Sequence, residues 1–152
     1  MTAGTNVLED AIPNKQRMFN SSIEDDSDTI VNCWTKGYHI TVLQAQNLPA
    51  VNKDEKTSDP SCLVVVSSAS NEFQAKSART EYLRKVLVPV WNQTLYIPVP
   101  TFNNNMIQFI IDDIDKGILQ NKTNDMCESK VMEIKDLLDG NQRWIDLYPI
   151  GK

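Results

Sequence analysis

The sequence predicts an all-β protein, built as a sandwich of about eight short strands. Short segments with alternating apolar and polar residues recur along the chain, most clearly over residues 38–45 (Tyr-His-Ile-Thr-Val-Leu-Gln-Ala). Proline, glycine and aspartate separate most of these segments, and no long amphipathic helix is evident. Regularly spaced short strands with turn residues between them are typical of β-sandwiches.

The expected elements follow from this alternation and from the enrichment in β-branched and aromatic residues. Strands are predicted over residues 29–34, 38–45, 62–67, 73–82, 93–98, 106–112, 128–134 and 143–147. One short helical turn is predicted over residues 135–139, before Gly140. Residues 1–27 are polar and acidic, so we expect a largely disordered leader there and a single folded domain over residues 28–152.

Composition places the chain among ordinary globular proteins. Its 152 residues are 41% hydrophobic and 23% charged, and no apolar run is long enough for a transmembrane helix. No secretory signal is recognisable, and the three cysteines lack metal-site spacing. We therefore expect a cytoplasmic, reducing environment.

The charge is distributed unevenly along the chain. Residues 1–28 carry a net charge of −4, which leaves −1 of the total of −5 for the rest. Without Asp59, Asp113, Asp115 and Asp125 the rest would carry +3. This balance suits an anionic surface, but it is not the basic footprint of a nucleic-acid-binding protein.

Carboxylates stand at the ends of two apolar strands. The run Ile107–Ile111 stops at Asp112 and Asp113, followed by Asp115, and Asp59 precedes another apolar run. Carboxylates on loops at one edge of a sheet suit Ca²⁺, which takes six to eight oxygen ligands. Because side chains alternate along a strand, Asp112 falls on the face opposite to Asp113 and Asp115, and we expect it to be a flanking, solvated acid.

Several motifs occur in an order that resembles the C2 domain family. They are residues 38–45, 47–52 (Asn-Leu-Pro-Ala-Val-Asn), 58–62 (Ser-Asp-Pro-Ser-Cys), 88–93 (Val-Pro-Val-Trp-Asn-Gln), 113–115 (Asp-Ile-Asp), 124–125 (Asn-Asp) and 144–147 (Trp-Ile-Asp-Leu). The resemblance covers roughly residues 36 to 148. It implies an eight-stranded antiparallel β-sandwich in which three loops form a Ca²⁺ cup that docks on phospholipid membranes.

The resemblance also implies a set of ligands. Asp59, Asp113, Asp115 and Asp125 match four of the five acidic positions of the family, and Asn52 falls where an aspartate is typical. Asparagine keeps a carbonyl ligand but loses a charge, and the third loop has about four extra residues. We therefore expect a weakened site.

Loop tips beside the cup supply the expected membrane contacts. Ile118 and Leu119 lie between Lys116 and Lys122 in the third loop, and the first loop adds Val51 and Lys53. Aliphatic residues at such tips can enter the lipid interface while the lysines meet phosphates. Ile118 and Leu119 folding back into a small packing cluster is an equal alternative.

A second basic group lies near the fourth predicted strand. Lys76, Arg79, Arg84 and Lys85 occupy a region that carries an anionic-lipid patch in some C2 domains. A solvated face of mixed charge is the favoured interpretation. Trp91 and Trp144 fall where the family places core aromatics.

These features predict a Ca²⁺-dependent phospholipid-binding module that associates peripherally with anionic membranes. The alternative is a Ca²⁺-independent module with a degenerate site, which docks on a lipid or on a protein partner. The only histidine, His39, has no recognisable nucleophile beside it, so we do not expect an enzyme. Because the chain ends soon after residue 147, we expect the synaptotagmin-like (type I) strand order, with residues 29–34 as its N-terminal strand.

Overall fold

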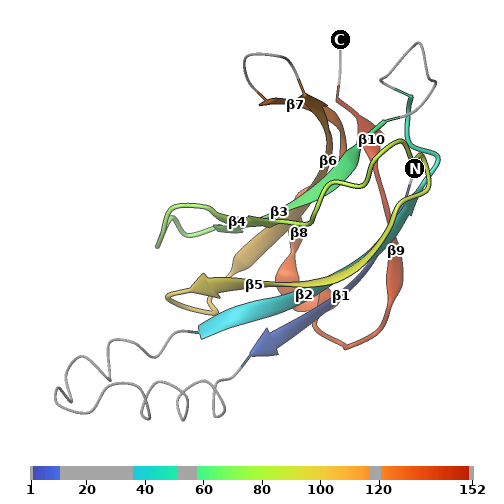
Figure 1. The fold of residues 1–152 in the computed structure, drawn as a ribbon. Coiled ribbons are helices and arrows are strands. Elements are labelled where there is room, and N and C mark those ends of the chain that lie inside the picture. Colours follow the sequence, from blue (N-terminus) through green and yellow to red (C-terminus); the bar gives the residue numbers. More distant parts are fainter. Residues whose placement is uncertain (1, 11–35, 51–57, 117–120, 151–152) are drawn as a thin grey trace, which may run out of the picture.

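The structure is a computed structural model that describes residues 2–10, 36–50, 58–116 and 121–150. These ranges hold ten strands and one 3₁₀ turn (Figure 1). The elements are β1 (Thr2–Asp10), β2 (Lys36–Gln46), β3 (Pro60–Ser68), β4 (Lys76–Arg79), β5 (Val90–Val99), β6 (Asn105–Lys116), β7 (Asn121–Glu128), β8 (Met132–Glu133), η1 (Ile134–Leu137), β9 (Arg143–Asp146) and β10 (Tyr148–Pro149).

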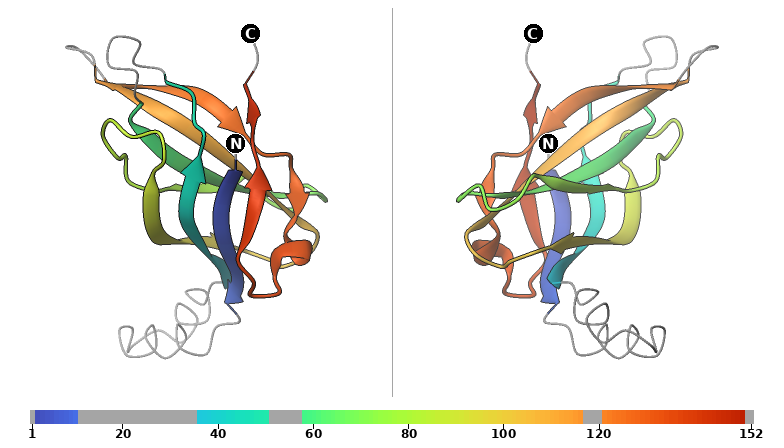
Figure 2. Two further views of the ribbon diagram at one scale, coloured as in Figure 1. Left: turned by 90° about the vertical axis from the view of Figure 1, so that its right-hand side faces the viewer. Right: turned by 90° about the vertical axis from the view of Figure 1, so that its left-hand side faces the viewer.

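The strands form two antiparallel sheets that face each other (Figure 2). One sheet has the order β5-β2-β1-β9. The other has the order β10-β7-β6-β3-β4, and β8 also pairs with β6. The predicted all-β class with sheets packed face to face is therefore confirmed.

Alternation along the central strands builds the core between the sheets. In β2 the side chains of Tyr38, Ile40 and Val42 are buried, with more accessible residues between them. In the facing sheet, Val64 of β3 is opposite Phe109 of β6, and both are buried. Because side chains alternate across a strand, this pattern fixes which residues of β3 and β6 face outward.

The first strand lies in a part of the chain that we expected to be a leader. Residues 2–10 form β1, which lies between β2 and β9, with Val7 opposite Ile40 and Ala3 opposite Ile145. The prediction of a largely disordered segment over residues 1–27 is wrong for this stretch. Residues 11–35, which include the predicted strand 29–34, lie outside the described residues.

The end of the second sheet also differs from the prediction. One strand was expected over residues 128–134. Instead, β7 ends at Glu128, and only Met132–Glu133 form a strand, β8, in the expected range. β6 and β7 pair as far as Lys116 and Asn121, so these strands include much of the predicted third loop. The predicted helical turn is confirmed as η1, one residue earlier than its expected start.

Candidate metal and membrane site

Asp59 and Asp113 meet where β3 begins beside the later part of β6. Pro60 is paired with Asp113, and the Asp59 N–H donates a 2.6 Å hydrogen bond to Asp113 Oδ1. The Ile114 N–H donates to the Asp59 carbonyl at 3.3 Å. The antiparallel register therefore brings together two acids that are 54 residues apart in sequence, as the strand-end pattern predicted.

The connection between β4 and β5 holds the Asp59 carboxylate from the other side. The Lys85 N–H donates a 2.7 Å hydrogen bond to Asp59 Oδ1, and the Val86 N–H donates to the Ser58 carbonyl at 2.8 Å. Lys85 has a φ of 55°, a left-handed conformation that non-glycine residues adopt infrequently. The local backbone therefore fixes the position of the Asp59 side chain.

The remaining predicted acids lie along the β6–β7 pair, and Asp125 does not form a group of three with Asp59 and Asp113. Asp115 is two residues beyond Asp113 in β6, and its backbone is opposite Lys122 of β7. Asp125 is exposed and is opposite Asp112, whereas Asn124 is opposite Asp113. The register thus places Asp125 on the neighbouring strand, one position away from direct pairing with Asp113.

Several predicted contact residues lie outside the described structure. Val51, Asn52 and Lys53 fall within residues 51–57, and Ile118 and Leu119 fall within residues 117–120. For Lys116 and Lys122 the structure describes the backbone at the ends of β6 and β7. The proposed membrane contacts of these residues remain predictions.

Asp112 is buried and ion-paired, which corrects the expectation of a solvated acid. Its side chain is 1% exposed, and it accepts hydrogen bonds from Arg79 Nη1 and, at 2.7 Å, from Ser61 Oγ. Arg79 Nη1 also donates to Ser61 Oγ at 3.0 Å, and its guanidinium lies 5.6 Å from the centre of the Tyr82 ring. Arg79 is thus not part of a simple solvated face but ties β4 to β6 across β3.

The surroundings of Arg79 stabilise its charged form. Partial burial lowers the pKa of Arg79, but the hydrogen bond and the negative charge of Asp112 outweigh that effect and raise it above its usual value. The Asp125 charge also contributes to this rise, which agrees with its place opposite Asp112. Strand alternation correctly separates Asp112 from Asp113, but it does not show that Arg79 of β4 pairs with Asp112.

The other basic residues of the predicted patch are exposed. Lys76 begins β4 opposite Val66, and Arg84 and Lys85 lie in the connection to β5 beside Asp59. Val88 and Val90 in the same region are 52% and 62% exposed. Arg84 and Lys85 therefore place exposed cations next to Asp59, and the exposed valines follow them along the chain.

The donor chemistry fits a hard cation, although the described set is incomplete. Asp59 and Asp113 provide carboxylate oxygens of the kind that Ca²⁺ takes. Within the described part of the chain, no group of three or more His, Cys, Asp or Glu side chains is close enough together to hold a metal. The side chain of Asp115, and Asn52 altogether, belong to the part that the structure does not describe.

The two tryptophans with described positions differ from each other. Trp91 is partly buried and packs against the core, as predicted. Trp144 of β9 is 49% exposed, so its assignment to the core is wrong. Its neighbours Ile145 and Leu147 supply the buried side chains, because they occupy the inward positions of the alternation.

Both described cysteines are buried, and their thiols are held in the neutral form. Burial raises the pKa of the Cys127 thiol to about 12 and raises the pKa of Cys62 further still. In a Cys33→Ser variant, we expect neither thiol to react with a disulfide reagent at pH 8 until denaturant is added, because the thiolate is the nucleophile. Rapid labelling of the native variant would contradict this expectation.

The two buried thiols should make the stability of the fold decrease at high pH. Their native pKa values lie above that of an unfolded thiol, about 8.5. Above that pH the unfolded thiols lose their protons while the native thiols stay neutral, and this favours the unfolded state. The free energy of unfolding is therefore unaffected by the thiols below about pH 8.5 and falls as the pH rises above it. Urea titrations at pH 7 and pH 10 measure the loss.

The sequence of this chain belongs to the C2 domain family, whose members are generally non-catalytic binding modules. The family matches residues 36–147, which include both sheets except β1 and β10. No curated protein matches the sequence closely enough to serve as a relative.

Solved structures give the same fold. A C2 domain of RIM2 (its domain A) is 17% identical with a TM-score of 0.58, and the comparison covers 99% of this chain and 96% of that domain. The corresponding domain of RIM from Drosophila is 14% identical with a TM-score of 0.59, covering 99% and 97%. The third C2 domain of KIAA1228 protein is 16% identical with a TM-score of 0.58, covering 99% and 89%. At these identities the likeness concerns the fold. Among the described residues, no helix is long and apolar enough to cross a membrane.

Proposed function

We propose that this C2 domain is a Ca²⁺-dependent phospholipid-binding module that acts without catalysis at the cytoplasmic surface of a membrane. Asp59 and Asp113 would hold the ion, joined by Asp115, Asp125 and Asn52. Bound Ca²⁺ supplies positive charge and open coordination positions for lipid oxygens. The observation that carries the proposal is the meeting of Asp59 and Asp113 at one end of the sandwich.

The surroundings of the two aspartates support an anionic lipid as the partner. Arg84 and Lys85 are exposed in the segment that hydrogen-bonds to Asp59, and Val88 is half exposed beside them. Each basic residue near an anionic surface contributes about 1 kcal/mol to binding. The loop-tip residues Val51, Lys53, Lys116, Ile118, Leu119 and Lys122 would extend this surface.

Vesicle co-sedimentation tests the proposal. The chain should pellet with phosphatidylserine-containing vesicles in Ca²⁺ and stay in the supernatant with excess chelator, because the aspartates repel anionic headgroups without the ion. Vesicles of phosphatidylcholine alone are the matched control and should bind little in either condition. Equal pelleting with and without Ca²⁺ would reject the calcium dependence.

A second candidate is a docking module that does not need Ca²⁺ and binds a lipid or a protein partner. Two observations favour it. Backbone N–H groups already occupy one oxygen each of Asp59 and Asp113, and Asn52 replaces an acid. Titration calorimetry separates the candidates, because this second function predicts no heat of Ca²⁺ binding up to millimolar concentrations.

A further inference from the structure

Two exposed valines stand where the connection between β4 and β5, residues 80–89, runs into β5. Val88 is 52% exposed and Val90 is 62% exposed, whereas Pro89 between them is buried. Because only the middle residue turns toward the core, both valines lie on the solvent side of the chain. Their apolar surface leaves water only if another surface covers it.

Hydrogen bonds hold this connection at the end of the sandwich that carries Asp59. The Lys85 N–H donates to Asp59 Oδ1 at 2.7 Å, and the Ala45 N–H donates to the Pro89 carbonyl at 3.1 Å. Val88 lies between these two anchored residues, and Figure 1 shows the connection passing the start of β3 before it enters β5. A segment that is fixed on both sides loses little conformational freedom when it binds a surface.

The charge of this region favours an anionic surface as the cover. No aspartate or glutamate occurs from residue 82 to residue 111, whereas Arg84 and Lys85 of the connection are exposed. Basic side chains beside exposed aliphatic ones suit an anionic bilayer, because the cations meet phosphates while the apolar groups enter the boundary of the acyl chains. The valines also follow directly on the residues that hold Asp59, so they continue the proposed lipid-binding site along the chain.

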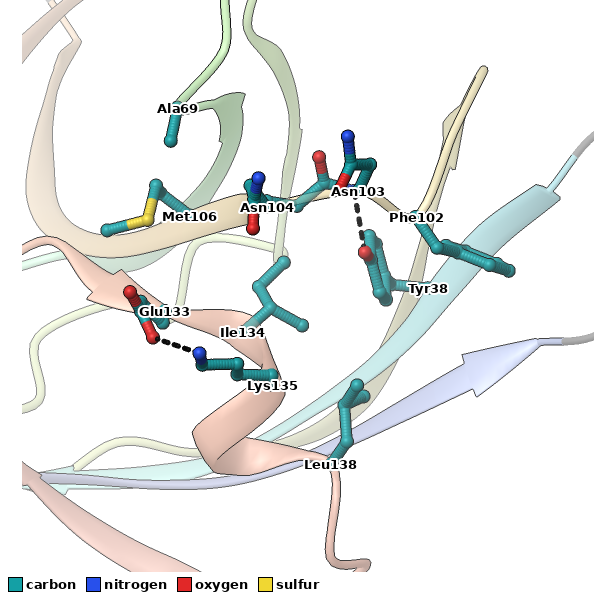
Figure 3. A pocket seen from close by; sticks show the side chains of 11 residues that line it. Tyr38, Ala69, Phe102, Asn103, Asn104, Met106, Glu133, Ile134, Lys135 and Leu138 are labelled. Carbon is teal, nitrogen blue, oxygen red and sulfur yellow. Dashed lines mark hydrogen bonds and ion pairs between the residues drawn. The ribbon is translucent and has the colours of Figure 1, made fainter.

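The end of the sandwich away from Asp113 is less suited to an anionic surface. A hollow there, drawn in Figure 3, is lined by Met106, the second residue of β6. Lys135 also lines it and is paired with Glu133 at 3.1 Å. Because the two charges of that pair neutralise each other, the pair attracts a headgroup less than an exposed cation does.

We propose that the β4–β5 connection enters an anionic phospholipid bilayer, with Val88 and Val90 against the acyl chains and Arg84 at the headgroup phosphates. The inference rests on the proposed function, because Ca²⁺ bound at Asp59 brings this end of the sandwich to the membrane. It adds a contact that the loop-tip residues of the first and third loops do not include. The affinity for vesicles therefore depends on the apolar surface of this connection as well as on the ion.

An environment-sensitive fluorophore attached to the full chain tests this insertion. It is placed on Val88→Cys in a Cys33→Ser background, where the buried Cys62 and Cys127 stay unlabelled. Val131→Cys is the matched control, because Val131 is 53% exposed and precedes β8, which pairs with the start of β6. With Ca²⁺ and phosphatidylserine vesicles that carry brominated acyl chains, we expect a blue shift and quenching at position 88 and neither at position 131.

Threonine variants measure what the valines contribute. Val88→Thr combined with Val90→Thr keeps the branched shape and the net charge but removes apolar surface, so the affinity for these vesicles in Ca²⁺ should fall about tenfold. Val131→Thr should leave the affinity unchanged. An unquenched label at position 88 on pelleted protein, or equal affinity of the double variant and the wild type, would overturn the bilayer as the cover and leave the calcium-dependent function intact. A wild type that does not pellet in Ca²⁺ would overturn both.

Discussion

Replacing Arg79 with alanine is expected to destabilise the domain by about 3–5 kcal/mol, the cost of leaving a buried charge without its partner. Asp112 is 1% exposed, and only Ser61 would remain as a described hydrogen-bond donor to it. The carboxylate would then lack the guanidinium that now pairs with it. Equilibrium unfolding in urea measures the difference in the free energy of unfolding.

The reverse substitution should cost less. The Arg79 side chain is 31% exposed, so in an Asp112→Ala variant the guanidinium can reach water and keep its contact with Tyr82. We expect a loss of roughly 1–3 kcal/mol from that variant. Replacing both residues with apolar ones, as Arg79→Met with Asp112→Leu, should recover most of the stability, because no buried charge is left.

These outcomes separate a buried ion pair from a surface one. An exposed pair contributes about 0–1 kcal/mol, and both single variants would then differ little from the wild type. Losses below about 1 kcal/mol for Arg79→Ala would therefore show that the pair is solvated in solution. The result also bears on the lipid patch, since an Arg79 held by Asp112 is less available to a headgroup.

The central strands were predictable because the signal is local. Alternation over residues 38–45 and 106–112 reflects one buried face, and β2 and β6 contain these segments. The convergence of Asp59 and Asp113 was also predictable, since both residues flank apolar runs in a recognisable motif order, although β6 continues past Asp113 to Lys116. Their hydrogen bond requires only the antiparallel register of β3 and β6.

Other features depend on partners that local sequence does not specify. β1 reads Thr-Ala-Gly-Thr-Asn-Val-Leu-Glu-Asp, a weak strand pattern, but it pairs with β2 on one side and β9 on the other. β7 is similarly polar, and its pairing with β6 fixes where it ends. Asp112 was expected to be solvated because it alternates away from Asp113 and Asp115, and local sequence does not show that Arg79 of β4, beyond β3 in the sheet, pairs with it. Tertiary pairing outweighed local propensity in each case.

Asp113→Asn is expected to remove the stabilisation by Ca²⁺ while leaving the fold intact. The asparagine keeps an oxygen that can accept the Asp59 N–H, but it loses the charge that a Ca²⁺ ligand supplies. In the wild type, Ca²⁺ at about one hundred times its Kd should add about 2.7 kcal/mol, or roughly 5–10 °C in Tm. The variant should show little of this shift at the same Ca²⁺ concentration.

The stability of the variant without Ca²⁺ shows whether the lost shift comes from ion binding or from damage to the fold. Because the substitution removes one of two neighbouring negative charges, the chelated variant should be at least as stable as the chelated wild type. Asp136→Asn, the same change at an exposed position of η1, should retain the full Ca²⁺ shift. A full shift in Asp113→Asn would exclude Asp113 as a ligand. An unshifted wild type would favour the calcium-independent module, in which Asp59 and Asp113 serve only to join β3, β6 and the β4–β5 connection.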